Sequence, residues 1–231
     1  MKTSKMNVSI IPLVAALLPI VAINIAYIIA SSYEHVPSCF VYFEGCTTVS
    51  ATGRAAPESL WFRATIIPSA VVSMICWRMT GAWLQCMEQQ LYKGTVIIQT
   101  LGILAGIFLI VYSVALGFIG PEYTFQRRMG VISFFSLTYL AELLLARRLW
   151  YIALKQPGVY PLKLAKYKLY LCTFLLVVGL ASVPISNYVG KDELENIVEW
   201  NFSILVYSYF FLIYLGWKAT GFKAELAVTR S

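Results

Sequence analysis

The chain is poor in charged residues and rich in apolar ones. Only 13% of its 231 residues are Asp, Glu, Lys or Arg, whereas 59% are hydrophobic. Soluble domains usually carry about 25% charged residues, which cover their surface. The sequence therefore excludes an ordinary soluble protein and predicts an integral membrane protein.

Histidine and the common motifs of soluble enzymes are also scarce. The chain has one histidine, His35, and no Cys-x-x-Cys pair of the kind found in zinc sites. It has no Gly-x-Ser-x-Gly motif and no phosphate-binding glycine loop, so serine-triad hydrolysis and nucleotide-driven transport lack support. We expect no metal and no cofactor. The net charge of +7 is expected to reflect orientation in the membrane rather than a nucleic-acid partner.

Long uncharged runs mark the membrane spans. A bilayer core of roughly 30 Å takes about 20 apolar residues as helix. The first apolar run is about twice as long as the core of a signal peptide, so we expect it to be retained as a helix. The sequence predicts an all-α membrane protein, a single domain over 1–231 with six transmembrane helices at about 9–30, 59–78, 95–119, 128–148, 168–188 and 199–217.

The basic residues orient these spans. The side that holds both termini carries 13 of the 18 Lys and Arg residues. Basic residues accumulate on the cytoplasmic side of membrane proteins. We therefore expect both termini in the cytoplasm and the longest loop, 31–57, outside. The membrane is expected to be the cytoplasmic membrane of a bacterium, or a secretory-pathway, lysosomal or plasma membrane of a eukaryote.

Two of the five cysteines, Cys39 and Cys46, lie in this outer loop. An outer compartment is usually oxidising, and a disulfide between them would close a short loop. The alternative is two free thiols. We predict the disulfide.

Each of the three helices that run inward begins with a glutamate: Glu58, Glu122 and Glu199. In one interpretation each carboxylate only complements the positive end of its own helix. In the other, the carboxylates gather at the outer mouth of the bundle and bind a lipid headgroup, a cation or a water that a carboxylate activates. The residues of this candidate site are His35, Arg54, Glu58, Arg63, Glu122 and Glu199, and the three glutamates and His35 are the candidates for any catalytic role.

Arg63 lies about one turn into the second span, where a guanidinium needs a partner. Glu58 is five residues away, about 140° around the same helix, which makes it a poor partner. We therefore expect Arg63 to pair with Glu122 or Glu199 on a neighbouring helix.

Further polar and small residues occur within or near the spans. Glu142 is an intramembrane acid that either reaches the cytoplasmic edge, pairs with a neighbouring helix or serves a function. Gly102 and Gly106 predict a small-residue face for close helix packing. A basic strip near the fourth loop either binds acidic lipid or only fixes the orientation; its lysines are Lys155, Lys163, Lys166 and Lys168.

Several of these features, taken in order, resemble the Frag/DRAM/Sfk superfamily, which includes the second post-GPI-attachment factor and the damage-regulated autophagy modulators. The stretch Val49-Ser-Ala-Thr-Gly53 followed by Pro57-Glu58 is similar to the first outer loop of that family, and Glu199-Trp200 is similar to the start of its last helix. The resemblance implies six helices, cytoplasmic termini and a lipid-linked role. The chain departs from the family before the fourth helix, where it has Glu122 and some relatives have histidine, so the resemblance does not extend to histidine-based chemistry at that position.

These observations favour a protein that binds, organises or remodels membrane lipid through a polar site at the outer leaflet. One alternative is a lipid-modifying enzyme, an acyltransferase or hydrolase, that uses outer carboxylates. A second is a transporter of small solutes or ions. Besides lipid, the expected partners are a membrane protein or further copies of this chain.

Overall fold

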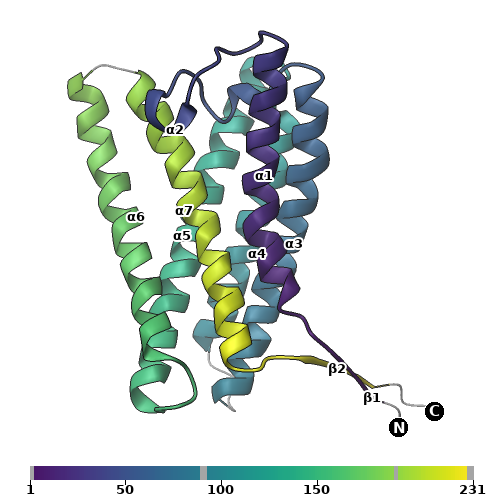
Figure 1. Cartoon of the computed structure of the whole chain (residues 1–231), viewed down its shortest axis with the longest axis vertical. Coiled ribbons are helices and arrows are strands. Elements are labelled where there is room, and N and C mark those ends of the chain that lie inside the picture. The colour runs from purple at the N-terminus through teal and green to yellow at the C-terminus, as the bar shows by residue number, and fades with distance from the viewer. Residues whose placement is uncertain (1–2, 89–92, 190–191, 228–231) are drawn as a thin grey trace.

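The computed structural model describes residues 3–88, 93–189 and 192–227. Six of its helices are long and apolar enough to cross a membrane, which confirms the all-α, multi-pass prediction (Figure 1). Their bounds are α1 (Ile10–Ser32), α3 (Glu58–Glu88), α4 (Lys93–Ala115), α5 (Pro121–Lys155), α6 (Leu162–Val189) and α7 (Asp192–Ala219).

Glycine and proline determine where α4 ends and where α5 begins. Gly117, with a φ of +89°, lies just beyond the end of α4, and left-handed backbone of this kind ends helices. Gly120 then precedes Pro121, whose fixed φ suits the first turn of α5. The α4 helix therefore ends four residues before the predicted 119, and α5 begins seven residues before the predicted 128.

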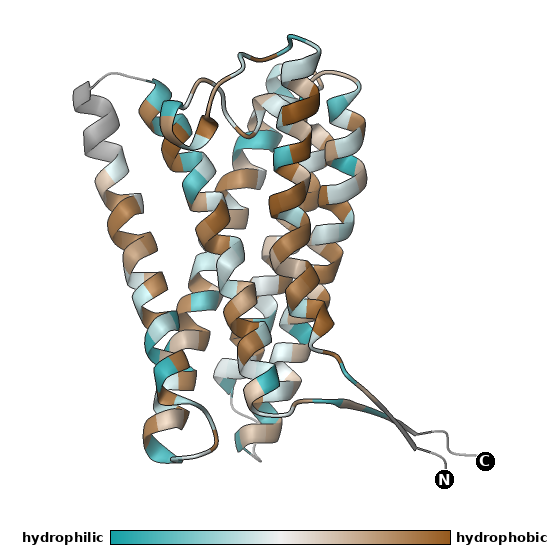
Figure 2. Ribbon diagram, viewed as in Figure 1, coloured by the Kyte–Doolittle hydropathy of each residue, from teal (hydrophilic) through white to brown (hydrophobic). Residues whose placement is uncertain are grey.

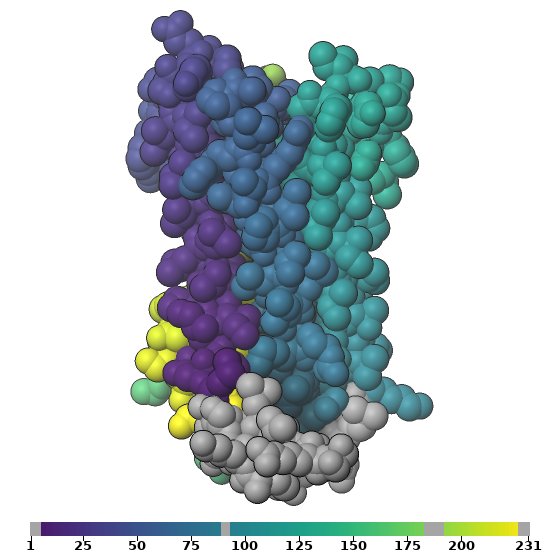
Figure 3. Space-filling model, turned by 90° about the vertical axis from the view of Figure 1, so that its right-hand side faces the viewer, coloured from purple at the N-terminus to yellow at the C-terminus, as the bar shows by residue number. Residues whose placement is uncertain are grey.

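The helices form a ring in which α1 packs on α3 and α7, α4 packs on α3 and α5, and α6 packs on α5 and α7. Figure 3 shows α1, in purple, lying beside α3, in blue. The α6 helix is the least buried: 22% of its most apolar window is buried, against 39% in each of the other five. Figure 2 shows hydrophobic residues along much of the length of the helices, as expected of surfaces in contact with lipid.

Two short strands, one near each end of the chain, pair with each other. The strands β1 (Thr3–Met6) and β2 (Ala224–Ala227) pair antiparallel, with Thr3 opposite Ala227. This ribbon projects from the end of the bundle opposite the outer loop (Figure 1). Both termini therefore lie on the same side of the bundle. The sequence analysis did not predict these strands.

The glycine face predicted on α4 packs against α3. A Cβ added to Gly102 would lie 2.2 Å from Cγ of Trp77, and one added to Gly106 would lie 2.4 Å from Cγ of Met74. Trp77 is fully buried, so its indole occupies the space that a side chain at position 102 would need. The small residues therefore let α3 and α4 approach closely, as predicted.

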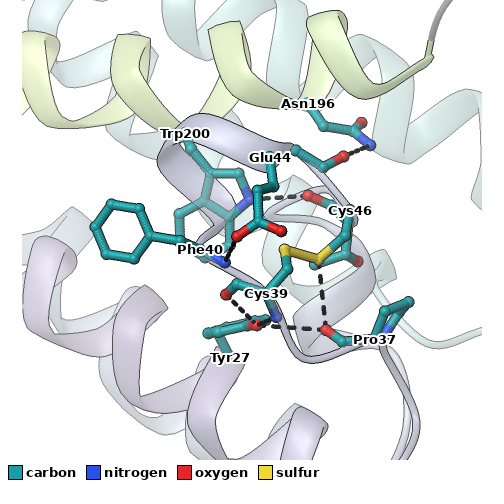
Figure 4. The surroundings of a disulfide bond; sticks show 10 residues. Tyr27, Pro37, Cys39, Phe40, Glu44, Cys46, Asn196 and Trp200 are labelled. Atoms are coloured by element: carbon teal, nitrogen blue, oxygen red, sulfur yellow. Dashed lines mark hydrogen bonds between the residues drawn. A yellow bond between two sulfur atoms is a disulfide. The ribbon is translucent and has the colours of Figure 1, made fainter.

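The outer loop covers the open end of the ring and contains the helix α2 (Val41–Glu44) and the 3₁₀ turn η1 (Ala51–Gly53). Cys39 and Cys46 form the predicted disulfide (Figure 4). A cross-link over so short a loop contributes about 2–3 kcal/mol in the chain-entropy treatment.

Hydrogen bonds tie this loop to α1 and α7. The Tyr27 hydroxyl of α1 accepts from the Cys39 N–H at 2.7 Å. On α7, Trp200 Nε1 donates to the Thr47 carbonyl at 2.9 Å and Asn196 donates to the Gly45 carbonyl at 2.7 Å (Figure 4). The loop is thus held over the bundle as part of the fold.

The environment of Tyr42 in this loop changes the pKa of its hydroxyl group. Burial raises the pKa of Tyr42, while the hydrogen bond from its hydroxyl to Asn24, at 3.0 Å, acts in the opposite direction. Tyr42 therefore stays neutral and keeps its hydroxyl as a donor to α1.

Candidate functional site

Glu58 and His35 form the first polar contact at the outer end. Nδ1 of His35 lies 2.8 Å from Oε1 of Glu58. Glu58, the first residue of α3, is fully buried, and its Oε2 has no hydrogen-bond partner among the described residues. The side chain of His35 is 36% exposed. This pair links the start of α3 to the loop that follows α1.

We expected Arg63 to pair with Glu122 or Glu199, but it pairs with neither. Its guanidinium donates to the Leu116 carbonyl and lies 5.1 Å from the centroid of the Phe118 ring. The last carbonyls of a helix have no partner within the helix and carry partial negative charge. The end of α4 supplies such acceptors beside Arg63.

Arg127 supports the same segment. It donates to the Phe118 carbonyl at 2.7 Å and to Oγ1 of Thr124 at 3.0 Å. Arg63 and Arg127 therefore neutralise the end of α4 and the turn after it, and the role of Arg63 in the structure is to cap a helix.

Glu122 lies apart from the other two glutamates. It is exposed in the first turn of α5 and turns back toward Gly120. No hydrogen bond or ion pair among the described residues joins it to Glu58 or Glu199. Its position is that of a carboxylate complementing its own helix dipole.

Glu199 is the glutamate that lines an internal chamber of the bundle. Its carboxyl group is within hydrogen-bonding reach of the backbone N–H groups of Val49 and Ser50 in the outer loop, and the charge of Arg54 acts on it. Arg54 is exposed and donates to Oγ of Ser50 at 3.1 Å. Three segments thus meet here: α7, the loop before η1 and the residue after it.

Two hollows meet at Glu199. A chamber of about 30 Å³ has Glu199, Tyr112, Ser203 and Tyr207 among its lining residues, and this volume holds about one or two waters. The second hollow is a lateral groove of about 560 Å³ between α5, α6 and α7, which also reaches Glu199.

The lateral groove is mainly apolar. Its walls include Val131, Phe135, Gly179, Val198 and Phe202. Toward the middle of the bundle it adjoins a smaller hollow of about 190 Å³, which shares Phe135, Gly179 and Phe202 with it. Sequence reasoning missed the groove, because it depends on how far α6 stands from its neighbours. The one feature of the sequence that could have indicated the groove is Gly179, where α6 has no side chain to fill it.

The half of the bundle nearer the two termini contains two further buried groups. Glu142 and Lys168 are both fully buried. The position of Lys168 corrects its assignment to the basic strip, because a buried amine cannot bind lipid at the surface. Lys155, Lys163 and Lys166 are exposed, as that interpretation requires.

The structure therefore brings together only part of the predicted outer site. Glu58 meets His35, Glu199 meets the backbone of Val49 and Ser50 in the loop, and Arg63 and Glu122 serve helix ends. The stretch 49–53 and Glu199, which carry the family resemblance at opposite ends of the chain, lie against each other. In comparisons with known proteins, no protein-family model, no curated protein and no solved structure matches this chain.

Proposed function

We propose that this chain binds and organises membrane lipid, with an acyl chain in the lateral groove and the headgroup at Glu199 and Arg54. The groove carries the proposal: it is mainly apolar, lies between membrane-spanning helices and reaches a carboxylate at its outer part. Its volume of about 560 Å³ is in the usual range for a small-molecule site.

The charges at the outer part favour a particular kind of headgroup. Two carboxylates, Glu195 and Glu199, line the groove and offer acceptors, and Arg54, whose charge acts on Glu199, offers a guanidinium, which binds phosphate well. A headgroup with both a phosphate and a donor, such as phosphoethanolamine, complements both. We also propose membership of the Frag/DRAM/Sfk superfamily, which the contact between Glu199 and the stretch 49–53 supports.

Filling the groove tests the binding proposal. Gly179→Trp is expected to lower co-purified lipid several-fold, because the indole would occupy the space next to Phe202. Native mass spectrometry measures the bound lipid. Val177→Trp is the matched control on α6, since Val177 is 58% exposed and does not line the groove. Equal lipid content in the two variants would refute the proposal.

A lipid-modifying enzyme is the second candidate, and the water-sized chamber beside Glu199 favours it. In that case Glu199 would act as a general base toward a water in the chamber. Glu199→Gln would then abolish hydrolysis of a labelled phospholipid while leaving lipid bound. A binding protein without catalysis would show no hydrolysis before or after the change.

We propose that the end of the bundle with both termini faces the cytoplasm. A membrane-impermeant maleimide applied to intact cells is expected to label Glu122→Cys, which is exposed at the outer end. It should label neither the exposed native Cys86 nor Lys155→Cys, although both react after the membrane is opened. Labelling of Cys86 in sealed cells would reverse the orientation.

A further inference from the structure

An acid and an amine lie buried within the bundle without hydrogen-bond partners. Glu142 of α5 and Lys168 of α6 are each 0% exposed. Neither carboxyl oxygen of Glu142 has a hydrogen-bond partner among the described residues, and the same is true of Nζ of Lys168. The two groups interact electrostatically but are not in direct ion-pair contact.

The neighbouring side chains complete a polar cluster. Nζ of Lys168 lies 4.1 Å from the centroid of the Tyr209 ring of α7, and the Tyr209 hydroxyl donates to the main-chain carbonyl of Glu142 at 2.7 Å. The Tyr209 hydroxyl is therefore committed to the backbone, and its ring faces the amine. The titratable groups that act on this pair are Cys76 of α3, Tyr139 of α5, Cys172 of α6 and Tyr209 of α7.

Leaving these groups unsatisfied in a membrane span would be costly. A buried polar group without a hydrogen bond destabilises the folded state, and a lone buried charge does so far more. The carboxylate accepts at two oxygens and the ammonium donates three hydrogens. A water between them can satisfy both, because it donates to the carboxylate and accepts from the ammonium.

We propose that Glu142 and Lys168 form a second polar site, in which an internal water bridges the carboxyl group to the amine and the pair holds one transferable proton. In one state the proton is on nitrogen and the pair is ionic. In the other, an N–H bond of Lys168 breaks, the water relays a proton, and an O–H bond forms on Glu142, leaving both groups neutral. The net charge of the pair is zero in both states.

The site also attaches α6 to the rest of the bundle. Among the described residues, α6 is the least buried span and packs mainly on α5 and α7, so an interaction with Glu142 ties α6 to α5. Removal of one partner leaves the other without its counter-charge, so the remaining group either stays charged at a high cost or becomes neutral while still buried without its partner. Removal of both partners removes that cost as well.

A double-mutant cycle tests the coupling. Glu142→Gln and Lys168→Met are each expected to lower the melting temperature by roughly 10 °C, and the double variant should recover at least half of the summed loss. Lys166→Met, at an exposed position on α6, is the control and should leave the melting temperature unchanged. If the single variants do not fold, the double variant should.

Infrared spectroscopy tests the proton directly. The carbonyl band of a neutral carboxylic acid should be stronger in Lys168→Met than in the unmodified protein, and it should be lost when Glu142→Gln is added. An experimental structure with resolved waters should show one between the two side chains. Additive losses in the cycle, failure of the double variant to fold, an unchanged carboxyl band or a dry site would each overturn the proposal.

Discussion

Replacement of Trp200 by alanine is expected to lower the free energy of unfolding by about 3–5 kcal/mol. Trp200 is fully buried, and its ring lies edge-on to Tyr27 at 5.9 Å and to Tyr42 at 5.5 Å. The substitution removes this packing and also the hydrogen bond from Nε1 to the Thr47 carbonyl. The contacts that Trp200 makes with α1 and with the outer loop are therefore lost together.

Thermal and denaturant unfolding in detergent measure this loss. Trp200→Phe keeps an aromatic ring but leaves the Thr47 carbonyl without its donor, so we expect a smaller loss of about 1–3 kcal/mol. Phe211→Ala is the control on the same helix, because Phe211 is 41% exposed. The Cys39–Cys46 disulfide should also be reduced faster in Trp200→Ala. An effect no greater than that of Phe211→Ala would contradict the role assigned to Trp200.

A single methyl group at Gly102 is expected to destabilise the protein by about 3 kcal/mol. Its Cβ would lie 2.2 Å from Cγ of Trp77 and 2.4 Å from both Cδ atoms. The added methyl group would overlap the part of the Trp77 ring that is attached to Cβ. Because this indole is fully buried, it has no free space to rotate into. Gly102→Ala therefore requires α3 and α4 to separate.

Gly179→Ala provides the matched control, because the nearest atom to its added Cβ lies 3.6 Å away on Phe202. Alanine is the better helix former by about 1 kcal/mol, so this variant should be neutral or slightly stabilised. The difference between the two glycine variants, measured by unfolding under the same conditions, isolates the clash. Equal stability of both variants would show that Trp77 yields at little cost.

The sequence predicts the spans well because an uncharged apolar run long enough to cross a bilayer seldom occurs in anything other than a membrane helix. It predicts their ends less well. The α3 helix continues past Arg78 to Glu88, since a helix beyond the membrane needs no apolar surface. The α6 helix already begins at Leu162, so Lys168 lies about 9 Å along it rather than at its start.

The candidate site was only partly predictable, for a geometric reason. The position of Glu58, Glu122 or Glu199 at a helix start fixes its depth in the membrane but not the direction in which it faces. Only the packing of the helices places Glu199 inward and Glu122 outward. Arg63 has a partner as expected, but the partner is a helix-end carbonyl and not a carboxylate.

The pairing of β1 with β2 has a consequence for biosynthesis. The strand β1 is synthesised before the six long apolar helices, whereas its partner β2 follows all six. The ribbon therefore cannot close until the last helix has been synthesised and returned to the side where the chain began. A nascent chain that stalls or inverts one of these helices would therefore leave the first strand with unpaired backbone N–H and C=O groups, which can pair with other chains.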